Sequence, residues 1–182
     1  MGIERESGGQ AAMRLSKREV TDTDELLGII EACRTVRIGA ADAEGMFVVP
    51  MSFGFDWEEG RDGRPRLTLW LHSASEGRKA AAFNAGGEAG VAVAIEMDCE
   101  DGVITGDYAC SYSFAYRSIM GTGTLFPVAS GEDKVYGLGR IMDHMAPYAP
   151  QAFGPGVIER TSVWRIDVDR FTGKKREAKP RA

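Results

Sequence analysis

Residues 35–55 of the chain, TVRIGAADAEGMFVVPMSFGF, contain its clearest secondary-structure signal. Val36, Ile38 and Ala40 alternate with Arg37 and Gly39, and this period of two is typical of a strand with one buried face. The tetrapeptide DAEG at 42–45 then indicates a hairpin turn, after which residues 46–55 return as a second strand. The stretch therefore predicts antiparallel strand pairing early in the chain.

Pro50 lies inside the predicted returning strand. Because proline has no backbone N–H to donate to a sheet ladder, its position needs a reason. Three reasons are consistent with the sequence: an edge strand, a bulge, or a place where something other than a strand lies alongside.

The rest of the chain continues this pattern with a few helices added. Further strands are predicted at 67–71, 89–97, 115–128 and 161–168. Helices are predicted after Thr21 as N-cap, over 79–84, and over about 132–145 after Ser130 as N-cap. The apolar residues predicted to face inward from the first and last helices are Leu26, Ile30, Cys33, Val135, Leu138, Ile141 and Met142. The predicted fold is α+β, with an antiparallel β-barrel and a few flanking helices.

Length and composition limit the class of protein. A chain of 182 residues has the length of one domain, and its formal net charge of −5 argues against nucleic acid or an anionic membrane as a partner. There is no apolar run near the ~20 residues of a membrane span and no apolar signal core, and the three cysteines form no CxxC pair. We therefore expect a cytoplasmic protein whose domain spans residues 14–174, with a disordered tail at 1–13 and a basic tail at 175–182.

Several familiar motifs are incomplete in this sequence. The glycine pairs at 121/123 and 137/139 begin like a dinucleotide fingerprint but lack its third glycine and its strand–helix setting. The first pair is interpreted as a bend in a strand, and the second as close helix packing. With only two histidines the chain offers no predicted metal site, and His144 is assigned to a helix end, where a cation is favoured. No catalytic acid–base pair is assigned.

The segment LWLHSASEGRKAAAF at 69–83 places cations at a strand-to-helix junction. Arg78 and Lys79 enter the first turn of the predicted helix, where positive charge is unfavourable unless an anion offsets it. Ser73 and Ser75 add hydroxyl groups, Ser75 also as a helix cap, and Gly77 allows close approach to the backbone. Such a group could hold a phosphate. A solvated surface turn explains the same residues equally well.

Three stretches together resemble the flavin-binding split-barrel superfamily of pyridoxamine 5′-phosphate oxidase, and most of all its branch of nitroimidazole-resistance proteins. They are FVVPMSFGFD (47–56), LWLHSASEGRKAAAF (69–83) and CSYSFAYRSIMGTG (110–123). The resemblance implies an antiparallel split β-barrel that binds FMN, with FAD or a deazaflavin as alternatives. The compact 73–79 segment favours a terminal monophosphate and hence FMN. A homodimer with the flavin at the subunit interface is also implied.

Site residues follow from the resemblance by position. It implies that the first stretch borders the flavin ring, that the second holds the ribityl phosphate, and that the third contributes to the site, often from the partner subunit. The residues so implied are Val48, Val49, Pro50, Met51 and Ser52 in the first, His72, Ser73, Arg78 and Lys79 in the second, and Arg117 and Ser118 in the third. The nitroimidazole-resistance proteins have a histidine matching His72 beside the flavin. A phosphate or ribityl ligand is the preferred role for His72, with proton donation near the ring as the alternative.

The function implied is an FMN-dependent oxidoreductase that reduces nitro compounds or other small electron acceptors. A flavin- or haem-binding sensor or storage module without turnover is the alternative, because no acid–base pair is evident. Vitamin B6 oxidation is not expected. The family's pyridoxal-phosphate-binding segment is unmatched at 161–174, where Trp164 and Arg165 occur without its pattern.

Overall fold

The computed structural model describes residues 15–60 and 63–178, so the tail predicted at 1–13 lies outside the described residues. The strands are β1 (Glu19–Val20), β2 (Val36–Asp42), β3 (Gly45–Met51), β4 (Phe53–Glu59), β5 (Pro65–Ala74), β6 (Val91–Ile104), β7 (Ser113–Pro127) and β8 (Thr161–Arg176). The α-helices are α1 (Thr23–Ala32), α2 (Arg78–Asn84), α3 (Gly131–Met145) and α4 (Pro155–Arg160). Short 3₁₀ turns lie at Ser16–Arg18, Gly87–Ala89 and Ala109–Ser111.

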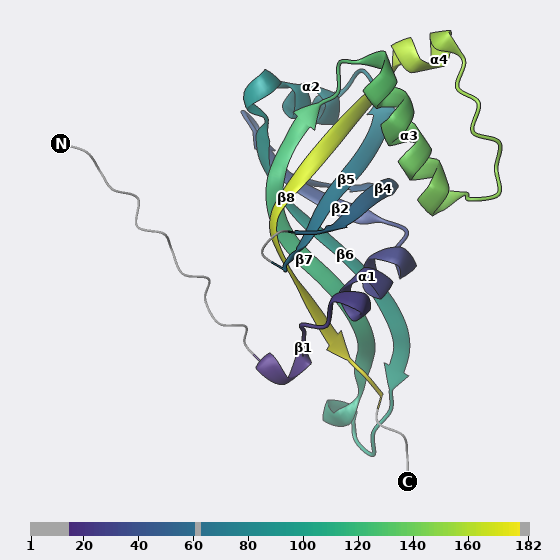
Figure 1. Ribbon diagram of the computed structural model, residues 1–182. Coiled ribbons are helices and arrows are strands. Elements are labelled where there is room, and N and C mark those ends of the chain that lie inside the picture. The colour runs from purple at the N-terminus through teal and green to yellow at the C-terminus, as the bar shows by residue number, and fades with distance from the viewer. Residues whose placement is uncertain (1–14, 61–62, 179–182) are drawn as a thin grey trace.

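The described strands form one antiparallel sheet in the order β3-β2-β6-β7-β8-β5-β4, with β1 paired to β8. β3 and β4 are consecutive in the chain and separated only by Ser52, yet they stand at opposite ends of this order. The strongly curved sheet (Figure 1) is therefore a barrel that stays open between β3 and β4. This confirms the predicted α+β split barrel.

The β2–β3 hairpin forms as the sequence predicts, with Val36 opposite Met51 and Asp42 opposite Gly45. In the described sheet β3 pairs only with β2, so Pro50 lies in an edge strand, the first of the three alternatives. The predicted strand at 46–55 is interrupted at Ser52, where the chain passes from one edge of the barrel to the other. The open side of β3 thus lies along the split.

Inward side chains of the sheet fill the barrel. The largest fully buried residues are Trp164, Phe53, Phe83, Ile29, Ile30, Ile38, Leu67, Leu69, Leu71, Ile95, Met97 and Ile119. Helix α1 contributes to this core through Leu26, Ile29 and Ile30. Its N-cap is Asp22 and not the predicted Thr21, because the Asp22 carboxylate accepts a hydrogen bond from the Glu25 N–H at 2.9 Å. A carboxylate also complements the helix dipole there.

Helix α3 covers the outer face of β4 and β5 (Figure 1) and begins at the predicted cap, Ser130. Gly137 allows the close packing that the sequence suggested, since a Cβ there would lie 2.5 Å from the Trp70 indole. Leu138 and Ile141 are buried as predicted. The inward prediction for Val135 is wrong. It is 40% exposed because the contact face of the helix is centred on Gly137.

The glycines of β7 mark a bend, as predicted. A Cβ at Gly121 would lie 2.6 Å from the Arg170 carbonyl oxygen, and one at Gly123 would lie 2.5 Å from that of Asp167. Between these glycines the register of β7 against β8 shifts. Side chains at these positions would separate the two strands where the sheet curves.

The C-terminal strand is longer than predicted. β8 runs on to Arg176, so residues 175 and 176 of the predicted basic tail pair with β7 within the sheet. Lys175 Nζ lies 2.5 Å from Glu25 Oε1, which ties this end of the strand to α1. Helix α4 was not predicted, because its six residues are too few to show helical periodicity. None of the helices in the described part of the chain combines the length and apolar character needed to span a membrane.

Candidate cofactor site

The candidate site lies where β5 ends and α2 begins. Gly77 is the N-cap of α2 and has a φ of 101°, a value that favours glycine. No side chain caps the start of this helix with a hydrogen bond, so the predicted capping by Ser75 is wrong. At the other end of α2, the Trp164 indole N–H donates to Asn84 Oδ1 at 3.0 Å. The helix is thereby held on the barrel with Arg78 as its first residue.

Arg78 reaches from α2 to the β2–β3 turn. Its Nε and Nη2 donate to the two carboxylate oxygens of Asp42 at 2.7 and 2.8 Å, and its Nη1 lies 3.4 Å from Glu44 Oε2. The guanidinium also lies over the Phe47 ring, 4.9 Å from the ring centroid. This hydrogen bonding raises the pKa of Arg78 and lowers the pKa of Asp42. The anion that offsets Arg78 within the chain is therefore the carboxylate of Asp42. The sequence had indicated only a hairpin turn at this residue.

Phe47 joins the first and second stretches of the predicted site. Its ring stacks on Phe83 of α2 with centroids 6.4 Å apart, while Arg78 covers it from the helix start. Phe47 begins the first stretch, so β3 lies next to Arg78 at the start of α2. Along β3, Val48 and Pro50 are exposed, Val49 is half-buried, and Met51 is buried, and Ser52 just after the strand is exposed. The Met51 side chain belongs to the core, and only its backbone could face a ligand on the open edge.

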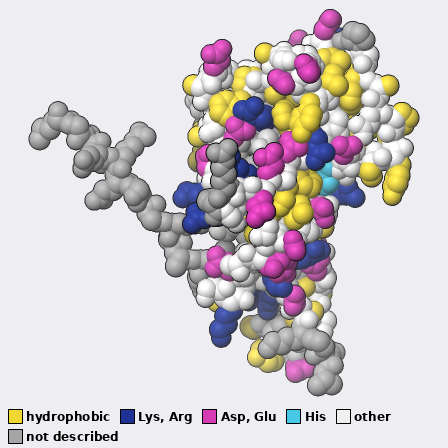
Figure 2. All heavy atoms as spheres, in the orientation of Figure 1, with side chains coloured by type: hydrophobic (Ala, Val, Ile, Leu, Met, Phe, Trp, Pro, Cys, Tyr) yellow, Lys and Arg dark blue, Asp and Glu magenta, His cyan; other side chains and the backbone are white. Residues whose placement is uncertain are grey.

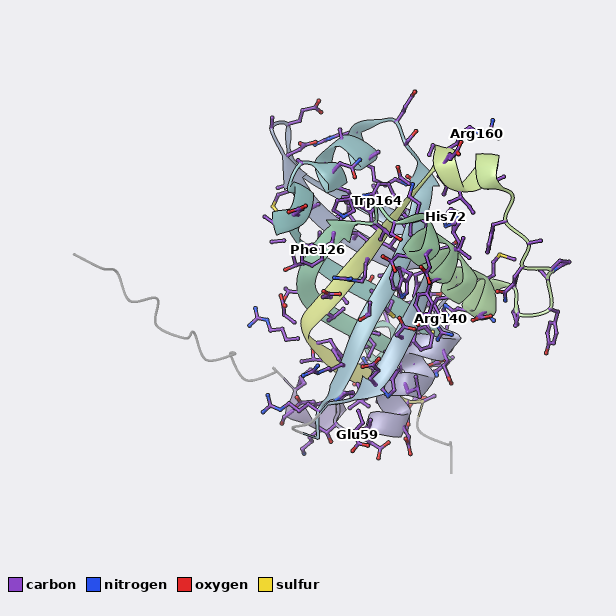
Figure 3. All side chains as sticks on the ribbon, turned by 45° about the horizontal axis from the view of Figure 1, so that its top comes forward. Glu59, His72, Phe126, Arg140, Arg160 and Trp164 are labelled. Carbon is purple, nitrogen blue, oxygen red and sulfur yellow. The ribbon has the colours of Figure 1, made fainter. Side chains whose placement is uncertain are left out.

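His72 and Ser73 lie near the end of β5. His72 is opposite Val163 of β8, and Figure 3 shows it in the same part of the molecule as α3 and Trp164. Its pKa is below the ordinary 6.5, first because surrounding protein atoms reduce the hydration of the imidazolium and second because Lys79 is positively charged. The Ser73 hydroxyl donates to the Ala74 carbonyl oxygen at 2.8 Å. Near neutral pH, His72 therefore has an uncharged ring that can donate one hydrogen bond and accept another.

We expect Lys79→Gln to raise the pKa of His72, because it removes the positive charge that opposes protonation. An NMR titration of the cofactor-free protein measures this, with the exposed Lys17→Gln as control. Because the pKa of His72 is lower in the folded protein than in the unfolded chain, the unfolded chain binds more protons than the folded protein once the pH falls below about 6.5. The free energy of unfolding should therefore decrease as the pH is lowered from about 7 to about 5, and this decrease should be smaller in His72→Gln. An unchanged titration in Lys79→Gln would contradict this interaction.

Arg117 and Ser118 of the third stretch lie away from Arg78 within one chain. Arg117, near the start of β7, donates to both carboxylate oxygens of Asp101 at 2.8 and 2.9 Å, which raises its pKa. Among the described residues, no hydrogen bond or ion pair joins Arg117 or Ser118 to Arg78. Helix α2 and the β6–β7 hairpin lie at opposite ends of the sheet in Figure 1. Within one chain, the contacts of Phe47 with Arg78 and Phe83 join the first stretch to the second, and the described contacts of Arg117 lie elsewhere.

Two polar groups outside this site attach α3 to the barrel. Asp56 accepts from Trp70 Nε1 at 2.7 Å and from the Tyr136 hydroxyl at 2.9 Å, and its carboxylate lies 2.8 Å from Arg140 Nε. His144 is in the last turn of α3 as predicted, but Nδ1 lies 2.9 Å from the Phe53 carbonyl oxygen and its ring packs on Phe53. Both groups serve the packing of the helix, so His144 does more than complement the helix end.

The fold is a split barrel in which Arg78, at the start of α2, lies beside the edge strand β3. A family model described as pyridoxamine 5′-phosphate oxidase matches residues 22–175, so the chain belongs to that family. No curated protein matches the sequence significantly.

Solved structures agree with this family. A candidate 5-nitroimidazole antibiotic resistance protein from Bacteroides thetaiotaomicron has 27% identity and a TM-score of 0.70, with 86% of each chain covered. A FAD and haem binding protein from Mycobacterium smegmatis has 19% identity and a TM-score of 0.72, covering 91% of this chain and 76% of the other. The flavocytochrome Anf3 from Azotobacter vinelandii has 20% identity and a TM-score of 0.70, covering 93% and 74%. The chain thus falls in the superfamily and branch that its motifs suggested.

Proposed function

We propose that the protein binds FMN and uses it to reduce small electron acceptors such as nitro compounds. The observation that supports the proposal is the contact of Arg78 with Phe47, by which the cation at the start of α2 lies against the edge strand β3. Membership of the pyridoxamine 5′-phosphate oxidase family and the similarity to a nitroimidazole-resistance protein support the same function.

The residues at the site fit FMN. Arg78 and Lys79 would offset a terminal phosphate, and a Cβ at Gly77 would meet nothing within 4 Å, so the backbone is accessible there. The open edge of β3 could supply backbone hydrogen-bonding groups to the polar side of the flavin ring. Bound flavin supplies the electron transfer, and the chain supplies its position and electrostatic environment. His72 could donate or accept a hydrogen bond near either part of the cofactor.

The proposed functional unit is a homodimer in which the partner supplies Arg117 and Ser118. Large apolar side chains remain exposed on β3 and on the β6–β7 hairpin: Met46, Val48, Val103, Tyr108, Tyr112, Phe114 and Met120. Figure 2 shows hydrophobic side chains at the surface, also at the lower end, where that hairpin lies in Figure 1. Covering them in a dimer would remove apolar surface from water.

We expect light scattering to show a dimer at micromolar concentration, with a total buried area above roughly 2,000 Å² in a structure of the complex. Met120→Glu should shift the equilibrium toward monomer and release the flavin. Tyr148→Glu changes an even more exposed side chain in the α3–α4 connection and should leave the dimer intact. A flavin-loaded monomer of the unmodified protein would contradict the shared site.

Stopped-flow absorbance tests turnover separately from binding. Under anaerobic conditions NADH or NADPH should reduce the bound flavin, and a nitroaromatic compound should then reoxidise it. If flavin binds but neither nucleotide reduces it at a useful rate, the oxidoreductase proposal fails and a flavin-binding module without turnover remains. Parallel titrations with FMN, FAD and a deazaflavin identify the preferred cofactor.

A further inference from the structure

Two cysteines that are distant in the sequence meet inside the fold. Cys33 and Cys99 are 66 residues apart, yet their Sγ atoms lie 3.2 Å apart. Cys33 ends α1 and is 1% exposed, whereas Cys99 lies on β6 and is half-buried. Both are free thiols. An S–S bond is about 2 Å long, so the sulfur atoms need to approach by only about 1 Å to bond.

We propose that Cys33 and Cys99 are a reversible oxidation site that forms an intrachain disulfide on reaction with a hydroperoxide. The disulfide would join the end of α1 to β6. This inference does not depend on the proposed flavin chemistry. Sequence reasoning did not find the pair, because the absence of a CxxC motif says nothing about cysteines that the fold brings together.

The surroundings of the two thiols give them different roles. Burial raises the pKa of Cys33, and the hydrogen bond to Cys99 raises it further, so the Cys33 thiol stays protonated. Cys99 is the more accessible sulfur and lies opposite Arg117 in the β6–β7 ladder. Cys99 is therefore the attacking thiol, and Cys33 is the resolving thiol.

The chemistry balances with hydrogen peroxide as oxidant. The Cys99 thiolate attacks one peroxide oxygen, an S–O bond forms as the O–O bond breaks, and the departing hydroxide takes up a proton as water. The Cys33 sulfur then attacks the Cys99 sulfenic acid, an S–S bond forms as the S–O bond breaks, and the second oxygen leaves as water with the Cys33 proton. Two thiols lose two electrons, and the peroxide gains them.

The test uses the full-length Cys110→Ser variant, which lacks the exposed third thiol. After peroxide treatment, acid quenching, alkylation and digestion, mass spectrometry should find a peptide pair linked through Cys33 and Cys99 that dithiothreitol separates. Closing a loop of this length should raise the unfolding midpoint by roughly 5–15 °C. Cys99→Ser should show neither the linked peptides nor the shift.

Three outcomes would overturn the inference. One is that both thiols remain open to alkylation after denaturation. Another is that Cys99 oxidises only to sulfinic acid while Cys33 stays free. The last is that the only linked peptides join different chains. Because the peptide mapping needs no substitution at either member of the pair, it stays informative even if variants at the buried Cys33 do not fold.

Discussion

Arg78→Ala is expected to weaken FMN binding by roughly 30- to 150-fold, because it removes a charge-assisted contact to the phosphate. Riboflavin has no phosphate, so its affinity should change little. Fluorescence titration with both ligands measures the difference. Equal losses for FMN and riboflavin would mean that Arg78 shapes the ring site or the fold and does not bind the phosphate.

The ion pair with Asp42 supplies the matched control. In the structure Arg78 binds Asp42 through both carboxylate oxygens, so a purely structural role would act through that pair. Asp42→Asn removes the charge from the pair and keeps Arg78. If Arg78 serves only to hold the β2–β3 turn, the two variants should have the same effect on FMN and riboflavin. If Arg78 binds the phosphate, only Arg78→Ala should weaken FMN binding more than riboflavin binding.

Gly54→Ala is expected to lower the free energy of unfolding by about 3 kcal/mol or more, the range of severe overpacking. A Cβ at Gly54 would lie 2.3 Å from the Arg140 carbonyl carbon and from the Ile141 nitrogen, and 2.4 Å from the Arg140 carbonyl oxygen. These are backbone atoms of α3, so no side-chain rotation can relieve the overlap. The helix would have to move away from β4, which would also disturb the contacts of Arg140 with Asp56 and with the Phe55 carbonyl.

Gly28→Ala is the control for this substitution. Gly28 lies inside α1, and a Cβ there would meet nothing within 4 Å. Alanine should therefore stabilise the protein by about 0.5–1 kcal/mol through its better helix propensity. Urea unfolding of both variants measures the difference. A loss below about 1 kcal/mol for Gly54→Ala would show that α3 does not dock as closely as the structure has it.

The barrel was predictable because its signals are local. The alternation in β2, the DAEG turn and the proline of the edge strand lie within 35–55, and each reflects the geometry of neighbouring residues. The length of β8 was not predictable, because residues 169–176 contain only one large apolar side chain, Phe171, and so show no alternation that would indicate a strand. Their strand conformation comes from pairing with β1 and β7, which are distant in the sequence.

The site was partly predictable for the same reason. The cations at 78 and 79 and the glycine before them are visible as a local cluster, whereas the partner of Arg78 is Asp42, on a separate hairpin. Nothing near Asp42 in the sequence indicates that contact, and the same holds for Cys33 and Cys99. The grouping of Arg117 and Ser118 with Arg78 came from resemblance, and one chain does not assemble it. That grouping stays a prediction about the dimer.

The cofactor content of the purified protein tests the central claim most directly. Protein purified from cells should be yellow, and denaturation should release FMN, identified by chromatography and mass spectrometry, at close to one molecule per chain. A colourless protein that binds neither FMN, FAD nor a deazaflavin in titration would contradict the account, however well the barrel itself is formed.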